Sequence, residues 1–316
     1  MKAKAVFLLI LLICVTGLSQ TLSLKFGTPF RRTDLDVRWK APSNSLPKEV
    51  WVYRLLPRQF PPVAMSNLTA LGPFTRDDLV YSNASEMLFK KQSDELTSLL
   101  ISSRLGAIRL QKRNPYGPTN LATHIPKATE LPMLTSNFLA EIGIDVSEVE
   151  RRADGQPDFH IWEPSTEYFV NHAFITNTEF RAVNFRRSVD GATWVGNGSG
   201  GNCEIHFGEY GKPSGIKLSW RNLEHSKRYP VAPPATIVKW IQSGRAVQGM
   251  TRMDAEPIDW KTVRSLDVTK AELSYYAGDP FSPSDWLMPF VALWTSVDTG
   301  HSTVEVEIHC PVIEAH

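Results

Sequence analysis

Glutamate and histidine alternate along two segments of this chain, and this pattern could assemble a metal site. Glu204 and His206 belong to one segment, and Glu305, Glu307 and His309 belong to the other. Because side chains two apart on a strand share a face, each set is expected on one side of its strand. Imidazole and carboxylate groups bind zinc and other divalent metals. A metal-dependent hydrolase is one interpretation, and an ordinary solvated sheet face is the interpretation we favour.

Other catalytic patterns are weaker in this sequence. Ser199 lies in Gly-Ser-Gly, without the strand-to-helix elbow of a hydrolase serine, and the loop 196–202 lacks the lysine of a phosphate-binding loop. Asp154, Asp158 and Glu163 lie in a polar linker whose sequence does not fix a distance between two carboxylates. The sequence therefore indicates no catalytic residue and no cofactor, and it favours a protein that is not an enzyme.

Each of the same two predicted strands also carries a cysteine, on the face opposite its glutamates and histidine. Cys203 alternates with Glu204, and Cys310 follows His309, so both sulfurs are expected to face a core. A disulfide between Cys203 and Cys310 and a pair of buried free thiols remain alternative predictions. Strand alternation determines on which face of a sheet a side chain lies, but it does not determine how far one cysteine is from the other.

Aromatic side chains form two clusters along the chain. One comprises His160, Trp162, Tyr168, Phe169 and His172, and the other comprises Trp286, Phe290 and Trp294. Exposed aromatic residues could form a platform for a carbohydrate or a peptide. Core filling is the simpler interpretation, and we favour it for both clusters.

Three short apolar-striped segments each begin with proline and end with glycine. They are residues 61–72, 132–143 and 233–244, and each is predicted to be one helix. Tracts of alternating apolar and polar residues follow each one, which is typical of antiparallel strands. The predicted fold is α+β, with tandem units of one helix packed on a twisted antiparallel sheet. The units are expected at 49–120, 121–228 and 229–316, after an extended segment at 21–48.

The first residues have the character of a secretory signal peptide. Residues 1–20 combine two lysines, an apolar run from Ala5 to Val15 and small residues before Gln20. We therefore expect a secreted or extracytoplasmic protein without a membrane partner after leader removal. In that setting Asn67, Asn83 and Asn197 fit the glycosylation acceptor pattern.

The overall composition limits the partners of the protein. Apolar residues make up 42% of the chain, which indicates a globular protein. Its 34 lysines and arginines nearly balance its 33 aspartates and glutamates. Without a strong net charge, no general field draws the protein to nucleic acid, so we expect a protein or an extracellular polymer as partner.

The tract Arg187–Trp220 resembles the PepSY domain and the related propeptide module of fungalysin and thermolysin proteases. The matching positions are Asp190, Gly191, Val195, Gly196, Gly211 and Ile216, and the resemblance extends over residues 131–221. It implies a non-catalytic protein that binds or restrains a partner. We therefore expect a secreted binding or regulatory protein. The alternatives are the metal-dependent hydrolase and a cell-envelope structural protein.

Overall fold

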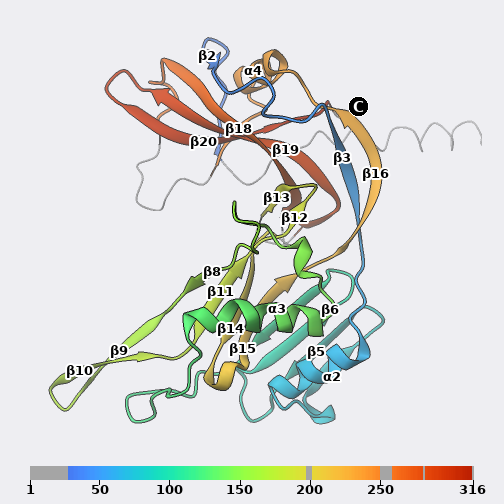
Figure 1. Cartoon of the computed structure of the whole chain (residues 1–316), viewed down its shortest axis with the longest axis vertical. Coiled ribbons are helices and arrows are strands. Elements are labelled where there is room, and N and C mark those ends of the chain that lie inside the picture. The colour runs from blue at the N-terminus through green and yellow to red at the C-terminus, as the bar shows by residue number, and fades with distance from the viewer. Residues whose placement is uncertain (1–27, 197–200, 250–257, 280–281, 315–316) are drawn as a thin grey trace, which may run out of the picture. The chain divides into compact units, whose positions relative to one another are not determined.

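Strands dominate the computed structural model of this chain. The structure describes residues 28–196, 201–249, 258–279 and 282–314, and these contain twenty strands and three α-helices (Figure 1). The prediction of tandem α+β units is therefore wrong. The structure is mostly β, and its strands join into two large sheets and one small hairpin instead of one sheet for each helix. The predicted leader at 1–20 and the acceptor Asn197 lie outside the described residues.

The three predicted helices are confirmed. They are α2 (Pro62–Leu71), α3 (Leu131–Glu141) and α4 (Pro234–Gln242), each with a proline in its first turn. Gly143 and Gly244, just after α3 and α4, have φ of 76° and 84°, the left-handed conformation that glycine adopts without steric cost. Gly72 ends α2 differently, with φ of −103°.

One sheet has eight antiparallel strands, in the spatial order β4-β5-β6-β7-β15-β14-β11-β8. The strands are β4 (Leu79–Ser82), β5 (Glu86–Lys90), β6 (Ser98–Ser102), β7 (Ala107–Gln111), β15 (Pro213–Ser219), β14 (Cys203–Phe207), β11 (Arg181–Phe185) and β8 (His160–Trp162). The pairing of β7 with β15 places Leu110 opposite Ile216. Strands expected in two separate units thus form one continuous ladder.

The helices α2 and α3 share a single core with this sheet. Ala64 and Leu68 of α2 and Leu131 and Leu139 of α3 are fully buried in that core. The sheet contributes alternate residues from its strands, namely Leu99, Ile108, Val183, Ile205 and Ile216. The other face of the sheet therefore carries the intervening side chains.

A second sheet has ten strands and follows the path β1-β17-β20-β19-β18-β13-β12, with β2, β3 and β16 paired off this path. Its strands are β1 (Thr28–Pro29), β2 (Asp36–Trp39), β3 (Glu49–Leu56), β12 (Ser188–Val189), β13 (Ala192–Val195), β16 (Asn222–Pro230), β17 (Val247–Gln248), β18 (Ser265–Asp279), β19 (Ser282–Asp298) and β20 (Thr303–Pro311). The helix α4 contacts β2 and β20. The predicted Asp190-Gly191 turn is confirmed between β12 and β13, with φ of 51° and 76°.

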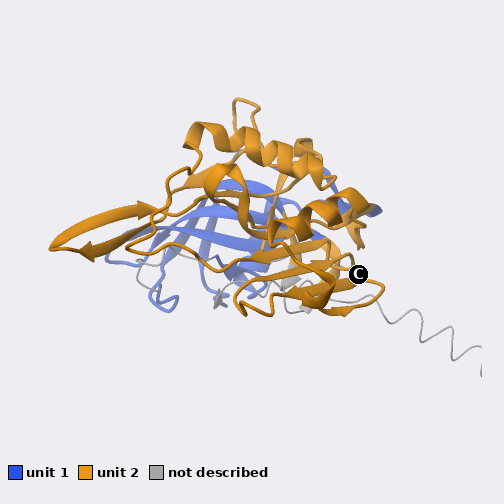
Figure 2. Ribbon diagram, turned by 90° about the horizontal axis from the view of Figure 1, so that it is seen from below, with its two compact units in different colours: residues 1–52, 225–274, 288–316 blue, residues 53–224, 275–287 orange. Residues whose placement is uncertain are grey.

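The chain divides into two compact units (Figure 2). One comprises residues 1–52, 225–274 and 288–316, and the other comprises 53–224 and 275–287. The second unit also contains a separate two-stranded sheet of β9 (Ser165–Val170) and β10 (Ala173–Thr178). Short 3₁₀ turns complete the described elements, namely η2 (Arg76–Asp78), η3 (Ala128–Glu130), η4 (Val146–Glu148) and η5 (Glu209–Gly211).

Candidate functional site

The hairpin of β9 and β10 is separate from both large sheets. Within the described part of the chain, β9 and β10 pair only with each other, in a register that runs from Val170 opposite Ala173 to Ser165 opposite Thr178. Asn171 and His172 connect them with φ of 49° and 65°. Two residues of positive φ make a turn whose twist suits a hairpin. Figure 1 shows the hairpin reaching away from the rest of its unit.

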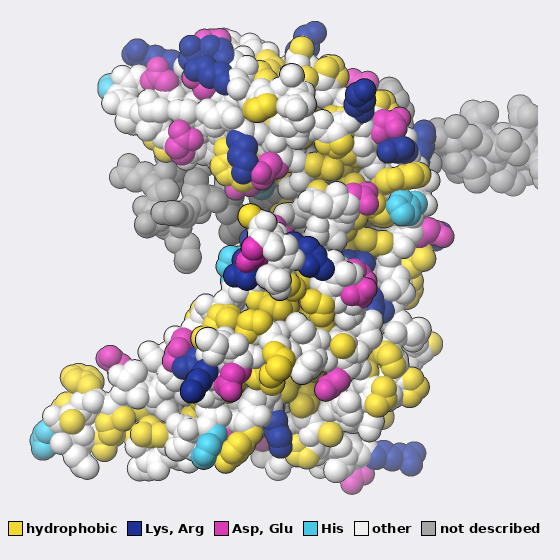
Figure 3. Space-filling model, in the orientation of Figure 1, with side chains coloured by type: hydrophobic (Ala, Val, Ile, Leu, Met, Phe, Trp, Pro, Cys, Tyr) yellow, Lys and Arg dark blue, Asp and Glu magenta, His cyan; other side chains and the backbone are white. Residues whose placement is uncertain are grey.

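Two phenylalanines are the main exposed feature of this hairpin. Phe169 and Phe174 are direct cross-strand partners and are 64% and 73% exposed. Their ring centroids are 5.1 Å apart, and the ring planes are inclined by 54°. Figure 3 shows hydrophobic side chains along the hairpin at the lower left. The inclined pair forms an apolar ridge on one face and not a flat platform.

Polar contacts hold one side of the hairpin base. The Tyr168 hydroxyl donates to Glu179 Oε1 at 2.6 Å, and Asn114 Nδ2 donates to Glu179 Oε2 at 2.5 Å. The backbone N–H of Ala122 donates to Asn177 Oδ1 at 3.2 Å. Glu179 and Asn177 are both buried. The hydrogen bond to Glu179 raises the pKa of Tyr168, which keeps this hydroxyl a donor.

An ion pair holds the other side of the base. Arg181 donates through Nε and Nη2 to the two oxygens of Glu163, at 2.9 and 2.6 Å. Thr178 Oγ1 donates to the same carboxylate at 3.1 Å. The pKa of Glu163 is lowered, chiefly by its hydrogen bonds with Arg181. The phenylalanine ridge therefore projects from a base that is fixed on both sides.

An aromatic strip of Trp162, Phe180 and His206 lies next to this base, on the sheet face away from the helices. Phe180 stacks on the His206 ring with centroids 4.3 Å apart, and Trp162 meets Phe180 edge-on at 6.2 Å. Trp162 is 46% exposed. Gly215, the cross-strand partner of His206, leaves room for the ring, because a Cβ there would lie 2.8 Å from His206 Nδ1.

The two sets of predicted metal ligands lie in different sheets. Glu204 and His206 belong to β14 in the eight-stranded sheet, and Glu305, Glu307 and His309 belong to β20 in the ten-stranded sheet. Each histidine instead contacts the glutamate two residues before it. The separation is 2.6 Å in both the Glu204–His206 and the Glu307–His309 pair. Within the described ranges, no group of three or more His, Cys, Asp or Glu side chains could hold a metal ion.

Cys203 and Cys310 are both free thiols, so of the two alternatives the disulfide is wrong and the pair of buried thiols is confirmed. Each sulfur is fully buried as its strand alternation predicted, but Cys203 belongs to β14 and Cys310 to β20, in different sheets. Burial raises the pKa of Cys203 to about 11 and also raises that of Cys310. Both thiols are therefore protonated and unreactive at neutral pH.

A groove of about 280 Å³ lies between the first turn of α3 and β8. Apolar side chains form most of its walls, and Arg152 provides a guanidinium. The lining residues are Pro132, Met133, Ser136, Arg152, Gln156, Pro157, Phe159 and Ile161. A mixed groove of this size can hold one side chain of a partner.

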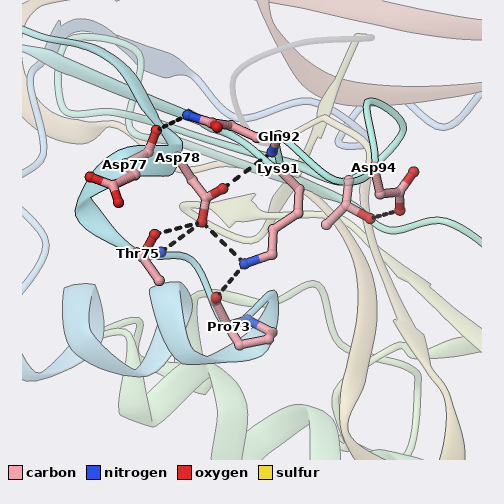
Figure 4. A network of polar contacts seen from close by, with 8 residues as sticks. Pro73, Thr75, Asp77, Asp78, Lys91, Gln92 and Asp94 are labelled. Atoms are coloured by element: carbon pink, nitrogen blue, oxygen red, sulfur yellow. Dashed lines mark hydrogen bonds and ion pairs between the residues drawn. The ribbon is translucent and has the colours of Figure 1, made fainter.

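A second hollow, of about 310 Å³, adjoins a polar network centred on Asp78 (Figure 4). The buried carboxylate of Asp78 accepts hydrogen bonds from the Thr75 N–H at 2.8 Å, the Gln92 N–H at 3.2 Å and Lys91 Nζ at 3.1 Å. Lys91 also donates to the Pro73 carbonyl at 2.7 Å. Because Asp78 and Lys91 satisfy one another and the neighbouring backbone groups, the network is structural and ties η2 to the end of β5.

Sequence reasoning identified the residues of the hairpin but assigned them to the core. Phe169 is exposed, and Trp162 is about half exposed, so core filling is wrong for both. In the other cluster Phe290 is fully buried, whereas Trp286 and Trp294 are partly exposed. One local signal was present in the sequence, because Asn and His both tolerate the positive φ that this two-residue turn requires.

Comparisons with known proteins add little to this description. No family model matches the chain, and no curated protein matches it. Among solved structures, an uncharacterized protein from Eubacterium rectale ATCC 33656 is similar to it with a TM-score of 0.46 and 12% sequence identity. That alignment covers 89% of this chain and 88% of the other. Across the described residues, none of the helices has the length and apolar character needed to cross a bilayer.

Proposed function

We propose that this protein is a non-catalytic binding protein that engages another protein through its β9–β10 hairpin. The observation that carries the proposal is the Phe169–Phe174 pair, which is exposed on a hairpin whose base is fixed. A large apolar surface left in water is typical of an interaction site. The resemblance to PepSY modules implies the same kind of role.

The shape of the hairpin favours a protein over a membrane or a carbohydrate. Its apex is the polar Asn171-His172 turn, and the phenylalanines lie behind it on one face. This arrangement suits contact from the side and not insertion of the tip. The inclined rings offer a ridge that can enter an apolar pocket of a partner.

The fixed base lowers the free-energy cost of this contact. Ordering a free loop on binding costs free energy, and a preorganised hairpin avoids part of that cost. Buried aromatic side chains at the centre of an interface commonly contribute 2 kcal/mol or more. Removal of either ring is therefore expected to weaken binding by roughly tenfold or more.

The test compares the natural chain with the double variant Phe169→Ala/Phe174→Ala. Each protein is used to select from a displayed library of random peptides, and selected peptides are titrated by fluorescence anisotropy. Val63→Ala is the matched control, because Val63 is 62% exposed on α2 in the same unit. We expect selection by the natural chain and by Val63→Ala, and loss of binding to the double variant.

Two results would contradict the proposal. In one, the double variant binds the selected peptides as tightly as the natural chain. In the other, the hairpin binds vesicles of phosphatidylcholine and phosphatidylglycerol, this binding disappears in the double variant, and no peptide is selected. That second result would assign the ridge to a lipid surface.

A further inference from the structure

Among the described strands, none pairs with the outer edge formed by β8 and β9. In the eight-stranded sheet, β8 is the terminal strand and pairs only with β11 among the described strands. β9 follows β8 directly in the chain and pairs only with β10. Ser165, Thr166 and Glu167 at the start of β9 are all exposed. An open strand edge presents backbone N–H and C=O groups that another strand can pair with.

The register shows which backbone groups of β9 point outward. Val170 and Ala173 flank a two-residue turn, so they form a hydrogen-bonded pair in the ladder. Such pairs alternate with non-hydrogen-bonded pairs along antiparallel strands. The backbone N–H groups of Ser165, Glu167 and Phe169 are therefore directed away from β10 and toward the open edge.

The outer side of β10 is less accessible near its base. Asn177, in β10, is buried and accepts a hydrogen bond from the backbone of Ala122. Glu179, just beyond β10, is buried and bonded to Asn114. The segment 114–122 thus lies against this strand, whereas the start of β9 is exposed.

The groove beside α3 adjoins the same edge. Phe159 and Ile161 form one wall of the groove, and Ile161 belongs to β8. Ile161 lies opposite the core residue Val183, so the groove opens on the face of β8 that packs toward α3. The phenylalanine ridge belongs to β9 and β10, which continue β8 and β11 along the chain.

From these observations we infer that the partner is an extended apolar peptide segment that adds as a strand to the edge of β9 and continues to β8. Its backbone pairs with the outward groups of Ser165, Glu167 and Phe169. Beside β9, side chains of the added strand contact Phe169, and beside β8 one of its side chains enters the groove next to Met133. In this mode the main chain supplies affinity and the pocket supplies selectivity. The inference rests on the proposed function and specifies the chemistry of its partner.

A pair of proline variants tests strand addition without removing the phenylalanine ridge. Glu167→Pro removes one outward N–H from the edge of β9, and Thr176→Pro removes the equivalent N–H from the edge of β10, since Glu167 and Thr176 are cross-strand partners. Glu167→Ala controls for loss of the carboxylate. Using peptides selected by the natural chain, we expect affinity to fall roughly fivefold in Glu167→Pro and to be unchanged in the other two.

A measurement on the unmodified chain provides the same information if a proline variant does not fold. Hydrogen exchange at single-residue resolution, with and without a selected peptide, should show slower exchange of the Glu167 and Phe169 amides. The Thr176 amide should exchange at an unchanged rate. Met133→Ala should weaken only those peptides that carry an apolar residue at the position that enters the groove.

The outcomes separate the two proposals. If Phe169→Ala/Phe174→Ala abolishes binding while Glu167→Pro binds normally and the β9 amides are not protected, the hairpin binds a partner but strand addition is wrong. Weaker binding of Thr176→Pro than of Glu167→Pro would also overturn the inference. If the phenylalanine variant binds normally, the proposed function itself fails.

Discussion

Asp78 shows how much of a carboxylate's role depends on contacts that a sequence does not display. Its neighbour Asp77 is exposed, whereas Asp78 is buried among donors from η2 and from the end of β5. The Thr75 N–H, followed by Lys91 and Gln92, holds the pKa of Asp78 well below its usual range. The two adjacent aspartates are alike in composition, and only the capping-box spacing from Thr75 to Asp78 separates them; the contacts with Lys91 and Gln92 have no such local signal.

This pKa predicts a specific pH dependence of stability. Because the folded-state pKa of Asp78 is lowered, its contribution is present above the unfolded pKa of about 4 and is lost as the pH falls toward the folded value. Asp78→Asn should therefore lower the thermal midpoint most at neutral pH, and the difference from the natural chain should shrink below about pH 4. Thermal unfolding followed by circular dichroism from pH 2 to pH 8, with Asp77→Asn as control, checks this. A difference that is constant with pH would contradict it.

Aromatic side chains are equally hard to assign to the core or to the surface from the sequence. Phe169 and Phe290 are identical side chains in strands, yet one is mostly exposed and the other is fully buried. Strand alternation determines which residues share a face. Whether that face meets a core depends on the elements packed against it, and those come from distant parts of the chain.

The helices were the most predictable elements. Proline in the first turn and glycine at the end are local signals, because both act through the backbone of the same few residues. All three helices begin and end within a few residues of the predicted positions. Gly143 and Gly244 adopt the left-handed conformation that favours glycine at a helix end, whereas Gly72 does not.

Gly143 offers a test of this local reasoning. Its φ of 76° is disfavoured for residues with a Cβ, and a Cβ there would lie 3.3 Å from the Pro61 ring. Gly143→Ala should lower the free energy of unfolding by about 1 kcal/mol, as measured by urea denaturation. Gly117→Ala is the control, because Gly117 lacks a positive φ and has open space around its Cβ position. Equal stability of the two variants would show that α3 tolerates another ending.

The β9–β10 hairpin was missed as an element because no strand was predicted over β9 and because residues 173–185 were predicted as one strand. β10 and β11 lie in one alternating run from residue 173 to residue 185, interrupted only at Glu179 and Phe180. No glycine or proline within residues 173–185 marks the point between β10 and β11 where the chain joins the eight-stranded sheet. The contacts of Glu179 and Arg181 with distant residues produce that change.

Across the whole molecule, the sequence predicted individual strands better than their pairing. The ladder between β7 and β15 joins residues about a hundred positions apart, and no turn signal specifies such a pairing. The units expected at 49–120 and 121–228 share one sheet and one core, with α2 and α3 in the same buried cluster. The repeated pattern of a helix followed by strands therefore led to a prediction of tandem units, which the structure does not contain.

This shared core predicts that neither segment folds alone. A fragment of residues 49–120 would leave β7 without β15 and would expose the core faces of Leu99 and Ile108. We expect fragments 49–120 and 121–228 to lack cooperative thermal unfolding by circular dichroism, whereas residues 21–316 unfold cooperatively. A cooperative transition in either fragment would mean that its half of the sheet is independently stable.

Pro164 has a consequence for the behaviour of this chain in concentrated solution. It falls between β8 and β9, where its ring fixes φ at about −65° and interrupts the regular strand. A peptide held by contacts on either side can accommodate one irregular point. Stacking of copies into a fibril requires long regular strands without proline, so this single residue lets the chain keep a receptive edge without promoting its own aggregation.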